Sequence, residues 1–295
     1  MMKKFLFVLL LVPFSGMTQF EFDANEFIDK LVGSVESDRP GQALNATTCG
    51  IAAIQIQTGF NYESVNNDKV WKYSHNYVPT TLRFGFTKKW ELNTSFYYLN
   101  ASYMDTLVDI NSKGFLSPEI GIRYAFLSGK GWKPYLALQA NASILSHRGD
   151  FQQQQWGSSF YLVTSNRFSK MSVNTNFGCV FPGDGNAQPT FPWVFNMGWM
   201  LGKKLGTFIE GFGEFRNLTV SFDAGFSYLA TSDLQIDLFG GMMNLTNETN
   251  RWFAELGITY RLSIFKIMAK KKAKEFMGNG GTGGFGGFGG GFGGN

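Results

Sequence analysis

The sequence contains little of the chemistry on which most enzymes and metal sites depend. Among 295 residues there are only two cysteines, Cys49 and Cys179, and two histidines, His75 and His147. Two cysteines are too few for a disulfide framework, and we expect two unpaired thiols, because Cys179 falls on the outer, apolar face of its strand. Both histidines fall in or beside expected loops, and Ser146 next to His147 would point to the opposite face of a strand. We therefore expect no catalytic residues, no metal and no cofactor.

Long hydrophobic runs and a strong excess of one charge are also missing. The apolar stretch at residues 5–13 is shorter than the roughly 20 residues of a membrane-spanning helix, and the mean hydropathy is only −0.10. The net charge is +4 and no arginine row alternates with stacking aromatics, so nucleic acid is not an expected partner. Aromatic residues, however, make up 17% of the chain, and there are 36 glycines. This combination suits a transmembrane β-barrel, whose strands have one apolar and one polar face.

The first 50 residues precede the first expected strand. Residues 1–18 have the pattern of a secretory signal peptide, with Lys3 and Lys4 before a short apolar stretch and small residues after it. Residues 19–50 form an expected periplasmic leader, in which Asp23 and Glu26 resemble a helix capping box. One short amphipathic helix would follow, with its apolar face made by Phe27, Ile28, Leu31 and Val32.

The stretch at residues 80–99, TTLRFGFTKKWELNTSFYYL, predicts a β-hairpin. On both sides of Lys88 and Lys89, apolar and polar residues alternate, which is the period-2 pattern of strands with one apolar face. A soluble β-sandwich also contains such hairpins. Here they recur along the chain without enough helix to cover their apolar faces, so the covering material is expected to be membrane lipid.

Similar patterns predict about twelve strands within residues 51–265. We expect them at residues 54–62, two within 80–99, and then 119–126, 135–144, 160–168, 171–181, 193–201, 207–215, 220–228, 234–240 and 253–265. Every second connection is short, whereas the others, at 63–76, 100–116, 146–157, 182–190 and 242–251, are mostly longer; 216–219 is the exception. Membrane barrels have short periplasmic turns and longer outer loops, so both chain ends are expected in the periplasm. The predicted fold class is all-β: one antiparallel up-and-down transmembrane barrel in the outer membrane.

Several of these motifs resemble one known family. The segments SVESDRPGQA, LRFGFTKKWELNTSF, EIGIRYAF and RWFAELGITYRL are similar to outer-membrane barrels labelled as transporters of the phenol meta-degradation pathway, which pair an E-x-D-R-P leader with R-x-G-x-x-x-x-x-E-L hairpins. The resemblance covers about residues 34–262 and implies a porin-like fold, and it carries little information about the substrate. The chain departs from the family pattern after Phe265, where a basic and then glycine-rich tail follows.

The inward positions of the expected strands collect charged residues. They are Arg83, Glu91, Glu119, Arg123, Arg167, Glu210, Glu214, Asp223, Asp237, Glu255 and Arg261. Such charges either pair and hold the barrel wall together, or line a path that favours one ion sign. Acidic groups outnumber arginines, so a lumen path would prefer cations. Arg83 and Glu91 lie on adjacent strands near one turn, and we expect them to pair.

The leader also holds a candidate lumen plug, formed by Glu36, Asp38 and Arg39. The alternative interpretation is a polar link between the leader helix and the barrel. In either interpretation, we expect the barrel to begin at residue 51, after the leader.

The expected C-terminal tail, residues 266–295, is basic and then rich in Gly and Phe, and we expect it to be disordered and periplasmic. Its regularly placed Phe285, Phe288 and Phe292 form a candidate contact for a periplasmic or membrane protein. The sequence thus favours a porin-like outer-membrane barrel that passes small solutes. The alternative is a non-transporting scaffold subunit of a larger outer-membrane machine for barrel assembly or protein secretion.

Overall fold

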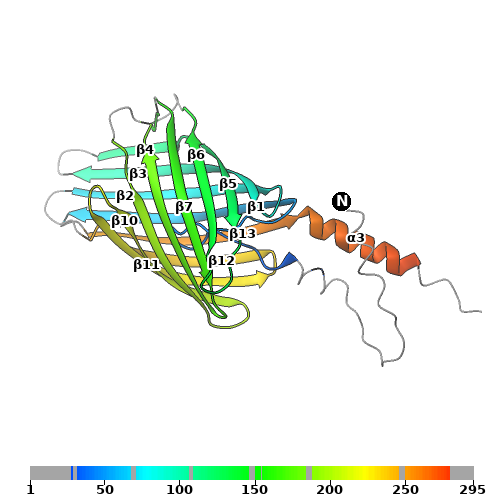
Figure 1. The fold of residues 1–295 in the computed structure, drawn as a ribbon. Coiled ribbons are helices and arrows are strands. Elements are labelled where there is room, and N and C mark those ends of the chain that lie inside the picture. Colours follow the sequence, from blue (N-terminus) through cyan, green and yellow to red (C-terminus); the bar gives the residue numbers. More distant parts are fainter. Residues whose placement is uncertain are drawn as a thin grey trace, which may run out of the picture.

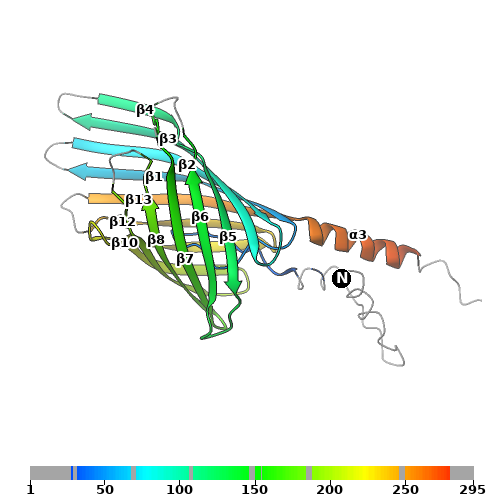
Figure 2. The same cartoon turned by 45° about the horizontal axis from the view of Figure 1, so that its top comes forward.

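The chain forms a closed antiparallel β-barrel, seen in Figures 1 and 2, in a computed structural model. The structure describes residue 28 and residues 32–67, 71–105, 109–145, 150–153, 155–183, 188–245 and 250–279. The described strands are β1 (Ala53–Asn67), β2 (Trp71–Gly85), β3 (Trp90–Asp105), β4 (Asp109–Phe115), β5 (Glu119–Leu127), β6 (Tyr135–Ser143), β7 (Gly157–Arg167), β8 (Met171–Phe181), β9 (Pro192–Met200), β10 (Leu205–Glu214), β11 (Thr219–Thr231), β12 (Leu234–Met243) and β13 (Asn250–Ser263). The helix α3 (Ile264–Asn279) follows directly.

Twelve of these strands make the ring. Strand β1 pairs with β2 on one side and with β13 on the other, which closes the barrel. Around the ring each strand pairs with its sequence neighbours, except that β3 pairs with β5 along Trp90–Ser95 and with the short β4 along Tyr98–Met104. The prediction of an up-and-down barrel of about twelve strands is confirmed.

The alternation of each strand decides what faces outward. On β13, Leu256, Ile258, Tyr260 and Leu262 are all exposed, whereas Thr259 between them is fully buried. Polar inward residues therefore face the lumen, and apolar outward residues form the lipid-facing belt of a transmembrane barrel.

The strands near the start of the chain are longer than predicted. Strands β1 and β2 include most of the residues assigned to the connection 63–76, and the end of β3 and all of β4 lie inside the predicted loop 100–116. The outward positions of the added part of β2, which include Ser74 and Asn76, are polar, so no apolar outer face indicates a strand there. Backbone pairing continues beyond the hydrocarbon region, where an outward side chain no longer needs to be apolar.

The C-terminal end of the barrel differs from the prediction. The last strand ends at Ser263, so Phe265 lies in α3, and residues 264–279 are helical where a disordered tail was expected. The sequence KIMAKKKAKEFM is rich in good helix formers, and the hydroxyl of Ser263 caps the helix by accepting the N–H of Lys266. Figure 1 shows α3 leading away from the barrel end at which β1 begins. No described helix is long and apolar enough to cross a membrane.

Some predictions fall outside the described residues. They are the signal peptide, most of the leader helix, His147, and the tail residues Phe285, Phe288 and Phe292. Of the leader helix, Ile28 and Val32 are described and both are helical. Cys49 and Cys179 are free thiols, as expected.

Candidate functional site

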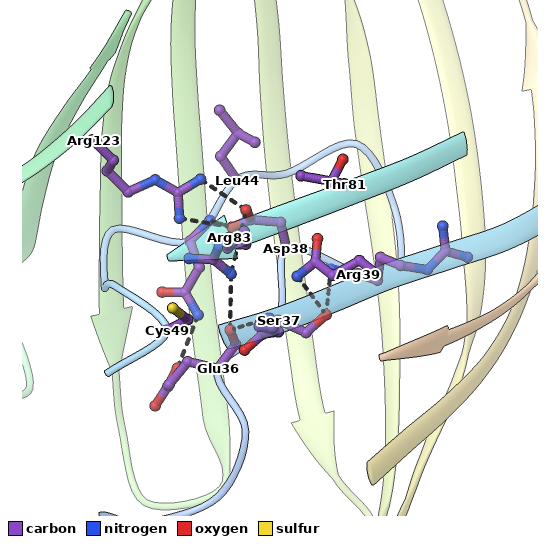
Figure 3. Close-up of polar contacts among 12 residues, drawn as sticks. Glu36, Ser37, Asp38, Arg39, Leu44, Cys49, Thr81, Arg83 and Arg123 are labelled. Carbon is purple, nitrogen blue, oxygen red and sulfur yellow. Dashed lines mark hydrogen bonds and ion pairs between the residues drawn. The ribbon is translucent and has the colours of Figure 1, made fainter. Parts of the chain in front are cut away.

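Residues 33–50, which we call the lumenal segment, lie inside the barrel (Figure 3). The segment sits at the end of the barrel that carries the short turns. There the N–H of Val35 donates to the carbonyl of Ser232, and the hydroxyl of Thr48 donates to the carbonyl of Thr87. The chain therefore turns back into the lumen before it enters β1.

The deepest contacts are made by two buried arginines of the wall. Nε of Arg83 is 2.7 Å from Oε1 of Glu91, and both side chains are fully buried, so the predicted pairing is confirmed. Nη2 of Arg123 is 2.7 Å from Oδ2 of Asp38. Both guanidinium groups also donate to the carbonyl of Thr47, and Arg83 donates to that of Glu36. Wall charges thus hold backbone and side chains of the lumenal segment together (Figure 3).

Arg39 extends from the segment toward strands β12 and β13 of the wall. Nη2 lies 2.8 Å from Oδ1 of Asp237, Nη1 binds Glu255, and the guanidinium carbon is 5.6 Å from the ring centre of Phe239. The guanidinium needs the paired glycines 59 and 257 of β1 and β13, because a side chain at Gly257 would overlap it. The wall therefore contains a notch shaped for Arg39.

Polar wall side chains bind the backbone of the segment as well. The carboxylate of Glu210 accepts the N–H groups of residues 42 and 43, Asn176 bonds both the N–H and the carbonyl of Leu44, and Ser165 accepts the N–H of Ala46. Oε2 of Glu91 accepts the N–H of Cys49 at 2.6 Å. Such directional bonds satisfy backbone groups that have no secondary-structure partner, so the segment has one defined path through the lumen.

The surroundings of the segment shift two pKa values. Burial by itself would raise the pKa of Asp38, but the charges of Arg123 and Arg83 and their hydrogen bonds hold it below its ordinary value of 3.8. Burial, with the nearby charge of Glu91, raises the pKa of the Cys49 thiol to about 12. Asp38 is therefore a stable anion in the docked segment, and Cys49 is an unreactive thiol.

Each of the four predicted lumenal arginines is paired with a carboxylate. Besides the pairs above, Arg167 binds Glu36 at 2.6 Å and Arg261 binds Asp233 at 2.6 Å. Arg167 lies near the short-turn mouth, and about a third of its side chain is exposed. The charged wall is thus mostly a set of neutralised pairs.

Three predicted acidic residues that lie in the lumen have no arginine partner. Glu210 binds backbone amides, the carboxylate of Glu119 has no hydrogen bond or ion pair within the described residues, and both carboxylate oxygens of Asp223 are buried and unpaired there. Glu214 does not fit the predicted set, because it lies at the rim and accepts N–H groups from Phe191 and from the turn that follows β10. The first three are therefore the lumenal acidic groups that no arginine neutralises.

The sequence interpretation missed a cluster at the opposite, long-loop end. Oε2 of Glu63 is 3.1 Å from Nε2 of His75, and Arg251 binds the same carboxylate. His75 was expected in or beside a loop but lies in β2, because β1 and β2 are longer than predicted. Only the pairing register brings these residues together, and no local motif indicates it. No group of three or more His, Cys, Asp or Glu among the described residues could hold a metal.

Cavities lie on both sides of the lumenal segment. One of about 420 Å³ opens toward the short turns and is lined by residues that include Glu36 and Arg167. Two adjoining cavities of about 340 and 660 Å³ lie on the long-loop side, and both are lined by Tyr97, Glu119 and Asn141. The segment thus divides a lumen that has space at each end.

Comparison with known proteins assigns the family. Residues 37–262, most of the chain, match the family described as "Putative MetA-pathway of phenol degradation". The chain belongs to this family. A search among curated proteins found no match.

The solved structures that resemble this family member include outer-membrane transport proteins. An outer-membrane channel from Pseudomonas putida F1 is 11% identical and has a TM-score of 0.56, with 76% of this chain and 99% of the channel aligned. The transport unit of the autotransporter AIDA-I from Escherichia coli (11% identity, TM-score 0.47, 80% and 96% aligned) and the toluene transporter TbuX from Ralstonia pickettii (8%, 0.44, 72% and 90%) are more distant. At these identities the likeness concerns the fold: a closed outer-membrane β-barrel.

Proposed function

We propose that the protein is an outer-membrane channel through which small solutes diffuse, and that the lumenal segment is its plug. The observation that carries this proposal is the position of the segment between cavities that open toward the two barrel ends. A solute that enters from the long-loop side reaches Asp38 and Leu44 of the segment before it can go further. Passage therefore requires the segment to shift, and the resting conductance is low.

The charges left without a partner give the channel its ion preference. With the arginines paired, the lumenal acidic residues without an arginine are Glu119, Glu210 and Asp223, and a lumen in which they ionise favours cations. The same bias follows from the predicted inward positions of the strands, where acidic residues outnumber arginines. A shift of the reversal potential toward that of the cation in a salt gradient would support it, and its absence would contradict it.

Single-channel recording in planar bilayers tests the passage of solutes. We expect rare, short openings for the unaltered protein and frequent openings for Arg39→Ala, which removes the pairs with Asp237 and Glu255. Arg216→Ala is the matched control, because this arginine binds Pro189 and Gln188 in an exposed rim loop. No openings in any of the three proteins would refute the channel function.

The cavities in the lumen favour a channel over the scaffold alternative. Space on both sides of the lumenal segment suits the passage of solutes, whereas a scaffold subunit that transports nothing does not need it. The proposed orientation places the short turns, the leader and α3 in the periplasm, since outer-membrane barrels have their short turns there. In this orientation lipid contacts the outward belt, and both termini are periplasmic.

The tail adds a proposed partner to the channel. Phe285, Phe288 and Phe292 on a glycine-rich chain suit a weak, multivalent contact with a periplasmic or membrane protein. Truncation after Asn279 leaves α3 whole, and we expect it to leave the barrel folded while releasing proteins that co-purify. An unchanged set of co-purifying proteins would contradict this partner role.

A further inference from the structure

The two cavities on the long-loop side of the lumenal segment together form one chamber. Tyr97, Glu119 and Asn141 line both cavities, so the cavities adjoin at this level of the barrel. Asp38 and Leu44 of the lumenal segment line the floor of the inner cavity. A volume of about 340 Å³ for that inner cavity falls in the usual range of small-molecule sites.

The wall of the chamber is unusually rich in amides and hydroxyls. Pairing places Asn93, Gly121, Asn141 and Ser159 side by side across β3, β5, β6 and β7. Nδ2 of Asn141 donates to the hydroxyl of Ser159 at 2.9 Å. A Cβ at Gly121 would lie only 2.6 Å from Oδ1 of Asn93 and would overlap Asn141, so the absence of a side chain leaves a hollow into which both amides project.

Two polar groups of this wall have no partner among the described residues. The side chain of Asn93 is 6% exposed, and its Nδ2 donor is buried without an acceptor. Two residues further along the adjacent strand, the carboxylate of Glu119 is an acceptor without a donor. A buried donor without an acceptor is unfavourable, and a ligand that accepts from it would recover this cost.

The amide donor of Asn93 and the carboxylate of Glu119, which have no hydrogen-bond partner within the part of the chain that the structure describes, indicate which class of ligand fits the chamber. Asn93 offers a donor and Glu119 an acceptor, and a hydroxyl can both accept and donate. An organic cation would satisfy Glu119 but would have no acceptor for Asn93. An aromatic alcohol has a single hydroxyl and would leave most of the amides facing an apolar ring, which a site built for hydrogen bonds rejects. Tyr97 and Tyr161 add ring faces to the same chamber.

We propose that this chamber binds a neutral, polyhydroxylated solute such as a sugar, with hydroxyls that accept from Asn93 and donate to Glu119. The inference names the class of solute that the channel admits, and to that extent it rests on the proposed function. Binding itself needs only access from the long-loop side, so it can be measured while the lumenal segment remains docked.

Titration calorimetry of the detergent-solubilised full chain provides the test. The probes are maltose as a neutral sugar, butylammonium as an organic cation without an acceptor and p-cresol as an aromatic alcohol. We expect maltose to bind and the other two to bind far more weakly. Asn93→Ala and Glu119→Leu should each weaken maltose binding roughly tenfold, as the loss of one buried hydrogen bond predicts.

Two further variants separate the possible causes. Glu119→Gln keeps an acceptor at the same place, so maltose binding should remain within a few-fold, and heat-modified gel mobility verifies that each variant folds. Asn111→Ala is the matched control, because this exposed residue of β4 does not line the chamber. Binding of the cation or of the aromatic alcohol in preference to maltose would overturn the proposal, as would full maltose affinity in Asn93→Ala and Glu119→Leu.

A liposome-swelling assay with maltose distinguishes the two proposals. Binding without swelling, even for Arg39→Ala, would refute the channel and leave the sugar site intact. Swelling without binding would refute the sugar site and leave the channel intact.

Discussion

At the scale of single residues, the stability of the charged lumen depends on how completely each buried charge is paired and hydrogen-bonded. A charge removed from water is costly unless a partner of opposite sign and further hydrogen bonds replace the lost hydration. Arg83 has such a set: the carboxylate of Glu91 and the carbonyls of Glu36 and Thr47. The lumenal segment therefore supplies part of the polar environment without which the wall arginines would be unstable.

The pair of Arg83 and Glu91 permits a quantitative test. Because both are fully buried, Arg83→Ala or Glu91→Ala leaves an unpaired buried charge, and each should lower the free energy of unfolding by about 3–5 kcal/mol. The double variant should cost clearly less than the sum. Urea unfolding in detergent measures the cycle. The pair of Arg167 and Glu36, whose side chains are about a third exposed, is the control, with an expected coupling below about 1 kcal/mol. Strictly additive losses for the buried pair would show that the two residues do not interact.

Acidification should open the channel through Asp38. Docking of the segment lowers the pKa of Asp38 from 3.8, so the ionised carboxylate stabilises the docked state at pH values above 3.8. This stabilisation is lost as the pH falls through the lowered pKa of the docked state. Conductance should therefore rise as the pH falls below about 4. The charged groups that face Asp38 are Arg83 and Arg123.

Substitutions of Asp38 and Glu36 test whether Asp38 is the residue responsible for this pH response. Asp38→Asn should open at neutral pH and respond less to acid, whereas Glu36→Gln should keep the acid-dependent rise, because the Glu36 carboxylate is a third exposed. A pH profile of Asp38→Asn that matches the unaltered protein would contradict the assignment.

At the scale of elements, alternation predicts the strands only where lipid demands an apolar outer face. This is why most expected strands, from 54–62 onward, lie within observed ones, while β4 and the outer parts of β1 and β2 could not be recognised. The pairing of Arg83 with Glu91 was predictable because one tight turn joins their strands. Contacts such as that of Arg39 with Glu255 depend on how the lumenal segment folds back, which no local pattern encodes.

The start of α3 offers a test at this scale. Removal of the Ser263 hydroxyl by Ser263→Ala takes the cap from the helix, at a cost of about 0.5–2 kcal/mol. We expect faster amide hydrogen exchange in the first turns of α3, with protection restored in Ser263→Thr. Lys266, which binds Asp233 in the turn between β11 and β12, should keep the helix attached to the barrel. Unchanged exchange in Ser263→Ala would show that the cap contributes nothing.

At the scale of the whole molecule, the thiol of Cys49 reports whether the lumenal segment is docked. Burial closes off the sulfur and raises its pKa to about 12, so a maleimide should hardly react at mild alkaline pH in a Cys179→Ser background. The added change Arg39→Ala should increase the labelling rate at least about tenfold, because release of the segment exposes the thiol. Rapid labelling without Arg39→Ala would show that the lumenal segment is not held in place.

The site that holds Arg39 also affects how the barrel is closed. Glycines 59 and 257 lie on the first and last strands of the ring, and the seam between these strands is the join that turns a sheet into a cylinder. Arg39 binds Glu255 on one side of that join, Gln55 on the other side donates to the carbonyl of Glu36, and Ser37 shares a hydrogen bond with Thr259. The lumenal segment thus links the first strand of the barrel to the last one. The segment proposed as the plug therefore also helps to hold the barrel closed.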